Sequence, residues 1–139
     1  MSSQHVPVPS AMRRALAAVE AGLAFAEEER VKVAIVVLDR SYTPLAAVRM
    51  DDAYESTFKV ALAKAHTALN FRARTDAVRE RVKPENQAAL RNVERQLCFV
   101  GGGHPLVENG RIVGAVGVSG ASETQDTECS RLVAERFGT

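Results

Sequence analysis

The glycines of this chain are concentrated in one stretch. Seven of the nine lie between residues 101 and 120, in the segment GGGHPLVENGRIVGAVGVSG. Gly114 and Gly117 interrupt an otherwise β-branched run, and glycine weakens a strand unless another backbone or a ligand approaches it closely. Their spacing is G-x-x-G-x-x-G, which differs from the dinucleotide-binding G-x-G-x-x-G, and no Gly-Lys-Ser/Thr follows as in a phosphate-binding loop. The segment therefore predicts a strand with a close neighbour and argues against both nucleotide-binding folds.

Three of these glycines, residues 101–103, stand directly before His104 and Pro105. Glycine leaves the backbone without a Cβ, and proline cannot donate a ladder hydrogen bond, so a strand must break or bulge there. We expect this bend to border an open hollow that admits a small molecule. The alternative is that the glycines serve only turns and packing.

Apolar patterning elsewhere predicts an antiparallel sheet packed on helices. The first helix opens after the N-cap candidate Ser10 and ends in the charged run 27–30. Residues 33–38 are apolar on both alternating faces, so this strand should be covered on both sides. The sequence SETQ at 122–125 has the form of a capping box that starts the last helix. The other expected elements are a strand over 44–50, a helix over 55–70, one or two short helices within 71–95, and strands over 97–100, 105–107 and 112–118, the last two joined by a tight turn at Asn109-Gly110.

These elements predict an α/β (α+β) fold with about five antiparallel strands. We expect a flexible N-terminal lead over residues 1–9 and one domain over 10–139. The formal net charge of +1 argues against a nucleic-acid surface, and no apolar run approaches the roughly 18 residues that span a bilayer. No secretory signal pattern is visible at the N-terminus, which makes the cytoplasm the expected location. Cys98 and Cys129 are expected to be reduced thiols in or near the core.

Four motifs then resemble a known family. They are RMDDA at 49–53, KAHTA at 64–68, GGGHPL at 101–106 and GRIVGAVGVSGASETQD at 110–126. In this order they are similar to the GlcG/HbpS family, which includes the haem-binding C-terminal domain of PduO-type corrinoid adenosyltransferases. The chain departs from the family pattern at Asp52, where glycine is common, and the family does not fix His66 or His104. The matching positions are Arg49, Asp51, Lys64, Thr67, Gly102, Gly103, Pro105, Gly110, Gly114, Gly117, Ser119, Gly120 and Asp126.

The resemblance implies a profilin-like α/β fold and a homo-oligomer, commonly a tetramer or octamer. Some members bind haem or other tetrapyrroles, so haem is the expected cofactor and a tetrapyrrole or another small molecule the expected partner. Adenosyltransferase activity is not implied, because the domain that carries it is absent from this sequence.

His104 is the strongest candidate for chemistry. A neutral imidazole beside a bare backbone can ligate haem iron, or act as a general base near neutral pH. The alternative is a loop histidine bonded to a nearby carbonyl. His66 lies beside the buried apolar stripe of its helix. The same two alternatives apply to it, a functional imidazole or one bonded to a backbone carbonyl. No His/Cys/acid spacing of the metalloenzyme kind is present, so a structural metal is not expected.

Arg49 and Lys64 are candidates for binding carboxylates, either haem propionates or an organic acid. For both residues the alternative is an ion pair with Asp51, Asp52 or Glu55, which are close in sequence. Together with the histidines, the expected ligand-binding set is Arg49, Asp51, Lys64, His66, Gly102, Gly103, His104 and Pro105.

Two functions from different classes fit this set. One is a non-catalytic oligomer that binds haem or a related planar cofactor, with His104 as an axial ligand. The other is a cofactor-independent lyase, isomerase or hydrolase for a small organic acid, with His104 as acid or base and a site formed between subunits. An accessory oligomer without a ligand is a third possibility. Only seven residues are aromatic and none is tryptophan, which weakens the haem hypothesis.

Overall fold

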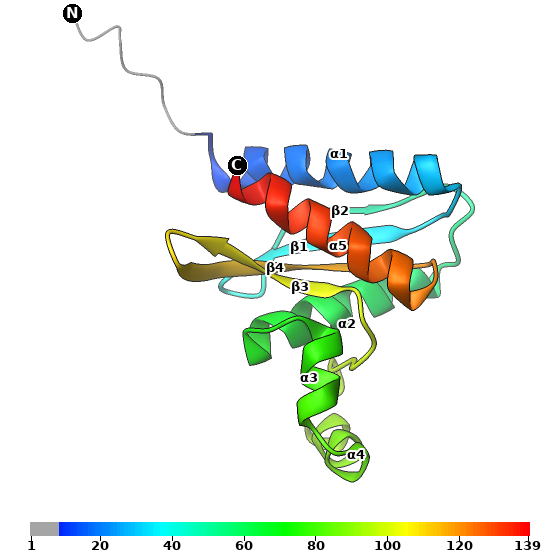
Figure 1. The fold of residues 1–139 in the computed structure, drawn as a ribbon, viewed down its shortest axis with the longest axis vertical. Helices are drawn as coiled ribbons and strands as arrows, with labels where there is room; N and C mark the ends of the chain where they lie inside the picture. The colour runs from blue at the N-terminus through cyan, green and yellow to red at the C-terminus, as the bar shows by residue number, and fades with distance from the viewer. Residues whose placement is uncertain (1–8) are drawn as a thin grey trace, which may run out of the picture.

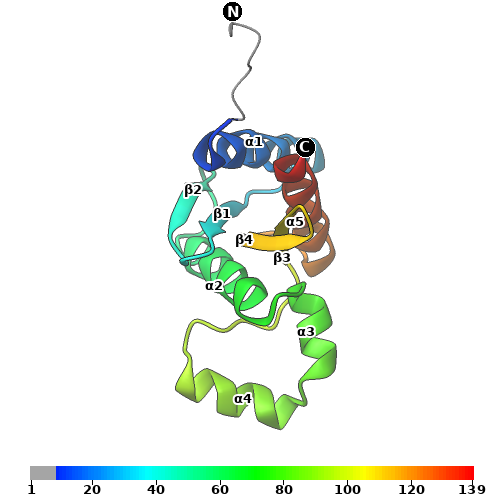
Figure 2. The same cartoon turned by 90° about the vertical axis from the view of Figure 1, so that its left-hand side faces the viewer.

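A computed structural model describes residues 9–139, so the expected lead at 1–9 lies almost wholly outside the described residues. Four strands form one antiparallel sheet in the order β2-β1-β4-β3. α1 and α5 cover one face, α2 covers the other, and α3 and α4 extend beyond α2 (Figures 1 and 2). The elements are α1 (Ala11–Glu29), β1 (Ala34–Asp39), β2 (Pro44–Arg49), α2 (Ser56–Phe71), α3 (Thr75–Arg81), α4 (Pro84–Val93), β3 (Gly103–Glu108), β4 (Arg111–Ser119) and α5 (Glu123–Gly138).

The prediction of about five strands is wrong by one, because residues 97–100 form no strand. Leu97 and Phe99 are buried in a small cluster with Val78 of α3, away from the sheet. The intervening Cys98 N–H donates to the Thr67 hydroxyl at 2.8 Å, not to a neighbouring strand. Here a loop buries alternate side chains against α3. Its apolar residues therefore alternate with the same period as those of a strand.

β1 is the centre of the core, and the prediction that helices cover it on both faces is confirmed. Five of its six residues are buried. Ile35 and Val37 pack on the side of α1 and α5, whereas Val36 and Leu38 pack on Ala61 and Ala65 of α2. Residues of alternate parity on one strand thus enter two separate apolar clusters.

Local signals set the ends of the elements as expected. Ser10 caps α1 by accepting the Arg13 N–H, and Ser122 and Gln125 form a reciprocal capping box at α5. Burial raises the pKa of the Cys129 thiol to about 12, and both cysteines are free, in agreement with the expected reduced thiols. Among residues 9–139 no helix is both long enough and apolar enough to cross a membrane.

Candidate functional site

The glycine bend packs against a buried ion pair. The Lys64 ammonium lies 3.1 Å from the Asp126 carboxylate and donates to the Val118 carbonyl at 2.9 Å. Lys64 is only 2% exposed and Asp126 only 3%. The second Asp126 oxygen accepts the Ala121 N–H at 3.1 Å. This network joins the middle of α2 to the end of β4 and to the first turn of α5.

This network fills the space at Gly102 and Gly103, so the expected open hollow is absent beside these two glycines. Beside Gly101, Glu123 and Thr127 line a depression of about 380 Å³. Gly102 has a φ of +127°, and a Cβ there would lie 2.9 Å from the Lys64 ammonium and 2.5 Å from the Val118 carbonyl oxygen. Gly103 is also enclosed, and its N–H donates to the Thr75 hydroxyl at 2.9 Å. The chain's own residues fill the space, which explains the lysine and both glycines without any ligand.

The pKa values of the two acids around the bend, Asp126 and Glu123, are shifted in opposite directions. Burial raises the pKa of Asp126, while the charge of Lys64 lowers the same pKa in part. Glu123 behaves in the opposite way. It accepts the Gly101 N–H at 2.7 Å and pairs with Arg79, and these contacts hold its pKa below the ordinary value.

His104 lies on the edge strand β3, one residue beyond the bend. Its Nδ1 is 2.9 Å from the Pro105 carbonyl oxygen, which can only accept, so Nδ1 carries the proton and Nε2 the lone pair. Within residues 9–139 no buried side-chain nitrogen lacks a hydrogen-bond partner, and Nε2 has none, so Nε2 reaches solvent. Burial lowers the pKa of His104, and the charges of Arg74 and Arg131 lower it further. The lowered pKa favours the neutral imidazole, whose Nε2 has no hydrogen-bond partner in the described chain.

Pro105 supplies this carbonyl, and as an edge-strand proline it removes a hydrogen-bond donor from β3. His66 has different neighbours. Its ring centroid is 4.7 Å from that of Tyr42, and its Nε2 is 3.9 Å from the Glu94 carboxylate. Burial lowers the pKa of His66, and Glu94 raises it in part. Local partners thus account for His66, whereas the outer nitrogen of His104 has none.

Arg49 lies at the opposite edge of the sheet from His104. Register pairs His104 with Val116, Val116 with Val37, and Val37 with Ala46 of β2. Three strand spacings separate the two edges, about 14 Å. The Arg49 guanidinium donates to the Ala53 carbonyl at 2.6 Å and, within the described chain, has no ion pair. Arg49 and His104 could therefore share a ligand only across two subunits.

Asp51 is exposed and follows β2 directly. It shares with Arg49 the wall of a shallow depression of about 380 Å³, which Lys32 and Glu27 also line. Arg49 and Asp51, the two candidates from the motif RMDDA, thus lie in one depression, which no residue of the glycine bend lines.

The two half-buried histidines, His66 and His104, make folding stability depend on pH. Because their pKa values lie below 6.5 in the folded chain, the unfolded chain binds more protons near that pH. Their contribution is complete above pH 6.5 and is lost as the pH falls towards the folded pKa values. We expect the free energy of unfolding, measured in urea at a series of pH values, to fall from pH 7.5 to pH 5. The double variant His66→Gln/His104→Gln should have a smaller fall, and an unchanged one would contradict the assignment.

Known proteins share the sequence and the architecture of this chain. The model of the family described as "Haem degrading protein HbpS-like" matches residues 11–135. The chain belongs to the HbpS-like family. The match includes the glycine bend, the buried ion pair and His104, and it confirms the resemblance on which the sequence analysis relied.

Individual relatives of this HbpS-like chain are similar over most of its length. It is 39% identical over 111 residues to an uncharacterized 15.0 kDa protein encoded between dhaT and dhaS in Citrobacter freundii, covering 78% of this chain and 75% of the relative. It is 34% identical over 107 residues to the corrinoid adenosyltransferase PduO of the same organism, covering 74% of this chain but only 31% of that protein. The crystal structure of Klebsiella pneumoniae protein ORFY has a TM-score of 0.85 and 30% identity, with 99% of this chain and 95% of that chain covered.

Sequence reasoning missed the role of Asp126 in this HbpS-like fold. Its position in the first turn of α5 predicts only a favourable interaction with the helix dipole. The structure adds Lys64, 62 residues earlier, as its buried partner. Thr67 and Thr75, which accept the N–H groups of Cys98 and Gly103, were likewise not predicted. No local pattern indicates this pairing, because Lys64 and Asp126 lie 62 residues apart.

Proposed function

We propose that this protein binds haem or a related tetrapyrrole, with His104 as the axial ligand. The observation that carries the proposal is the state of that imidazole. Its Nδ1–H is held by the Pro105 carbonyl, and its Nε2 is neutral, accessible and free of partners in the described chain. A histidine oriented by a backbone carbonyl through one nitrogen is the usual arrangement for metal ligation through the other. The family description, which names haem, supports the same function.

The surroundings of His104 fit a tetrapyrrole in charge. Arg74 and Arg131 act on the imidazole electrostatically and are the cations available to propionates, while Asp76 acts on it with the opposite sign. Each arginine already pairs with acids, Arg74 with Asp76 and Arg131 with Glu128 and Glu135, so propionates would compete with these carboxylates. Haem would supply an iron centre for ligand binding or redox chemistry, and this chain would supply the nitrogen that holds it.

A homo-oligomer belongs to the same proposal. His104 is on an edge strand, and the space at Gly102 and Gly103 is filled, so one chain offers a surface and not an enclosed pocket. A planar cofactor needs cover on both faces to leave water. A second copy of the chain would provide the other face, as in the tetramers or octamers that the family resemblance implies.

Titration with haem tests the ligand directly. We expect a Soret band that saturates with haem, and we expect His104→Ala to shift that band and weaken binding by about tenfold or more, because one iron–nitrogen bond is lost. His66→Ala is the matched control, since it removes a half-buried histidine with local partners and should leave the band unchanged. If His104→Ala leaves both the band and the affinity unchanged, His104 is not the ligand.

A further inference from the structure

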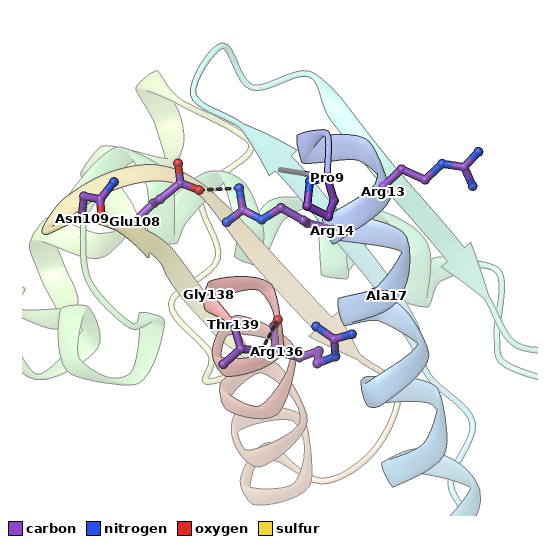
Figure 3. A pocket seen from close by; sticks show the side chains of 9 residues that line it. All are labelled: Pro9, Arg13, Arg14, Ala17, Glu108, Asn109, Arg136, Gly138 and Thr139. Carbon is purple, nitrogen blue, oxygen red and sulfur yellow. Dashed lines mark hydrogen bonds and ion pairs between the residues drawn. The ribbon is translucent and has the colours of Figure 1, made fainter. Parts of the chain in front are cut away.

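A second cavity of about 820 Å³ lies at the end of the molecule where α1 begins and α5 ends (Figure 3). Its walls come from the first turns of α1, the β3–β4 turn and the last turn of α5. Neither His104 nor any residue of the glycine bend lines it. The lining residues that matter for its chemistry are Arg13, Arg14, Ala17, Glu108, Arg136 and Thr139.

Arg14 is held in position at the centre of this cavity. It pairs with Glu108 of β3, and its guanidinium donates to the Phe137 carbonyl at 3.1 Å. The guanidinium carbon also lies 4.3 Å from the centre of the Phe137 ring. These contacts orient the guanidinium before any ligand arrives, which lowers the entropic cost of binding.

Arg136 adds a second, uncompensated charge. It lies in the last turn of α5, and in Figure 3 its side chain points from α5 towards α1, while that of Arg13 points away. Within residues 9–139, neither Arg13 nor Arg136 has an ion pair. Among the described lining residues of the cavity, Arg14 pairs with Glu108. Three arginines against one glutamate leave a net charge of +2 on the lining side chains.

The end of α5 contributes partial negative charge to this cavity, whereas the start of α1 contributes positive charge. The first turn of α1 carries no acidic residue, and its N-terminus adds positive potential. Residues 1–8 contain no aspartate or glutamate. Thr139 also lines the cavity, at the end of α5. The α5 carbonyls of Arg136 and Phe137 are occupied by the Thr139 N–H and by Arg14.

We propose that this cavity binds a small organic anion through Arg14 and Arg136, by paired hydrogen bonds to carboxylate or phosphate oxygens. Guanidinium groups suit both oxyanions because their N–H groups form a planar fork. The volume is within the range of small-ligand sites, and Ala17 and Pro9 leave room for an apolar body. Glu108 is four residues from His104 along β3, about 13 Å, so this site is distinct from the proposed haem ligand.

Calorimetric titration of the full chain with citrate and with pyrophosphate, at low ionic strength, tests the proposal. We expect at least one probe to bind, with affinity that falls as salt is added. Binding of citrate alone identifies a carboxylate ligand, and binding of pyrophosphate alone identifies a phosphate. Arg136→Gln should weaken binding about tenfold, equivalent to one charge-assisted contact. Its melting temperature, followed by circular dichroism, should stay close to that of the parent chain.

Arg13→Gln is the matched control, because it removes the same charge from the same rim but a side chain that points away. We expect a loss of less than about twofold, since only long-range attraction is removed. An equal loss in Arg13→Gln and Arg136→Gln would mean general attraction by surface charge and would overturn the site. Absence of binding by both probes would also overturn it. His104→Ala should leave probe binding unchanged, and a loss there would contradict a separate site.

Discussion

Replacing Gly117 by alanine will destabilise the protein more than any other single methyl group added to the sheet. A Cβ at residue 117 would lie 2.6 Å from the Ala65 nitrogen and closer still to the Ala61 carbonyl oxygen, both in the backbone of α2. No rotamer change relieves a clash between backbone atoms, so α2 must move away from β4. Overpacking of this kind costs about 3 kcal/mol of unfolding free energy or more when the whole interface must shift.

Urea denaturation measures this effect, and Gly138→Ala is the control. A Cβ at Gly138 would meet only the Val107 carbonyl, at 3.7 Å, which is an ordinary contact. We expect that variant to remain within about 0.5 kcal/mol of the parent chain. A Gly117→Ala variant that unfolds at the parent urea concentration would show that α2 does not rest on β4 as described.

Lys64→Met will remove the partner of a buried carboxylate. Asp126 is 3% exposed and keeps only the Ala121 N–H and neighbouring backbone once the ammonium is gone. Breaking a buried pair by removing one partner costs about 3–5 kcal/mol, because the remaining charge is uncompensated. We expect a loss of that size in urea denaturation. The double variant Lys64→Met/Asp126→Leu should recover most of it, since it removes both charges.

The pH dependence of Lys64→Met distinguishes a lost charge from a lost contact. Burial already raises the pKa of Asp126, and the charge of Lys64 opposes that rise. Without Lys64 the folded pKa rises further above the unfolded value. A raised carboxyl pKa contributes stability that is present at low pH and is lost as the pH rises through it. The deficit of the variant should therefore shrink from pH 7 to pH 5, and a deficit independent of pH would indicate packing alone.

The elements that depend on neighbouring residues were predictable from the sequence. Ser10 and the box formed by Ser122 and Gln125 cap their helices as expected, because a cap requires only residues within one turn. Asn109 and Gly110 adopt positive φ angles of 52° and 76°, as a two-residue hairpin turn requires. The apolar pattern of β1 likewise predicted two covered faces.

The tertiary structure alone decided what each of these patterns is used for. The glycines of β4 indicated a close neighbour, and only the fold shows that Gly117 meets the backbone of α2 and not a ligand. The sequence indicated Lys64 as a partner for the carboxylate of a ligand, and only folding placed the Asp126 carboxylate beside it. Arg49 and His104 read as one site until register placed them at opposite edges of the sheet. Local sequence carries capping, turns and burial because these depend on adjacent residues, whereas the identity of a partner depends on how distant segments of the chain pack together.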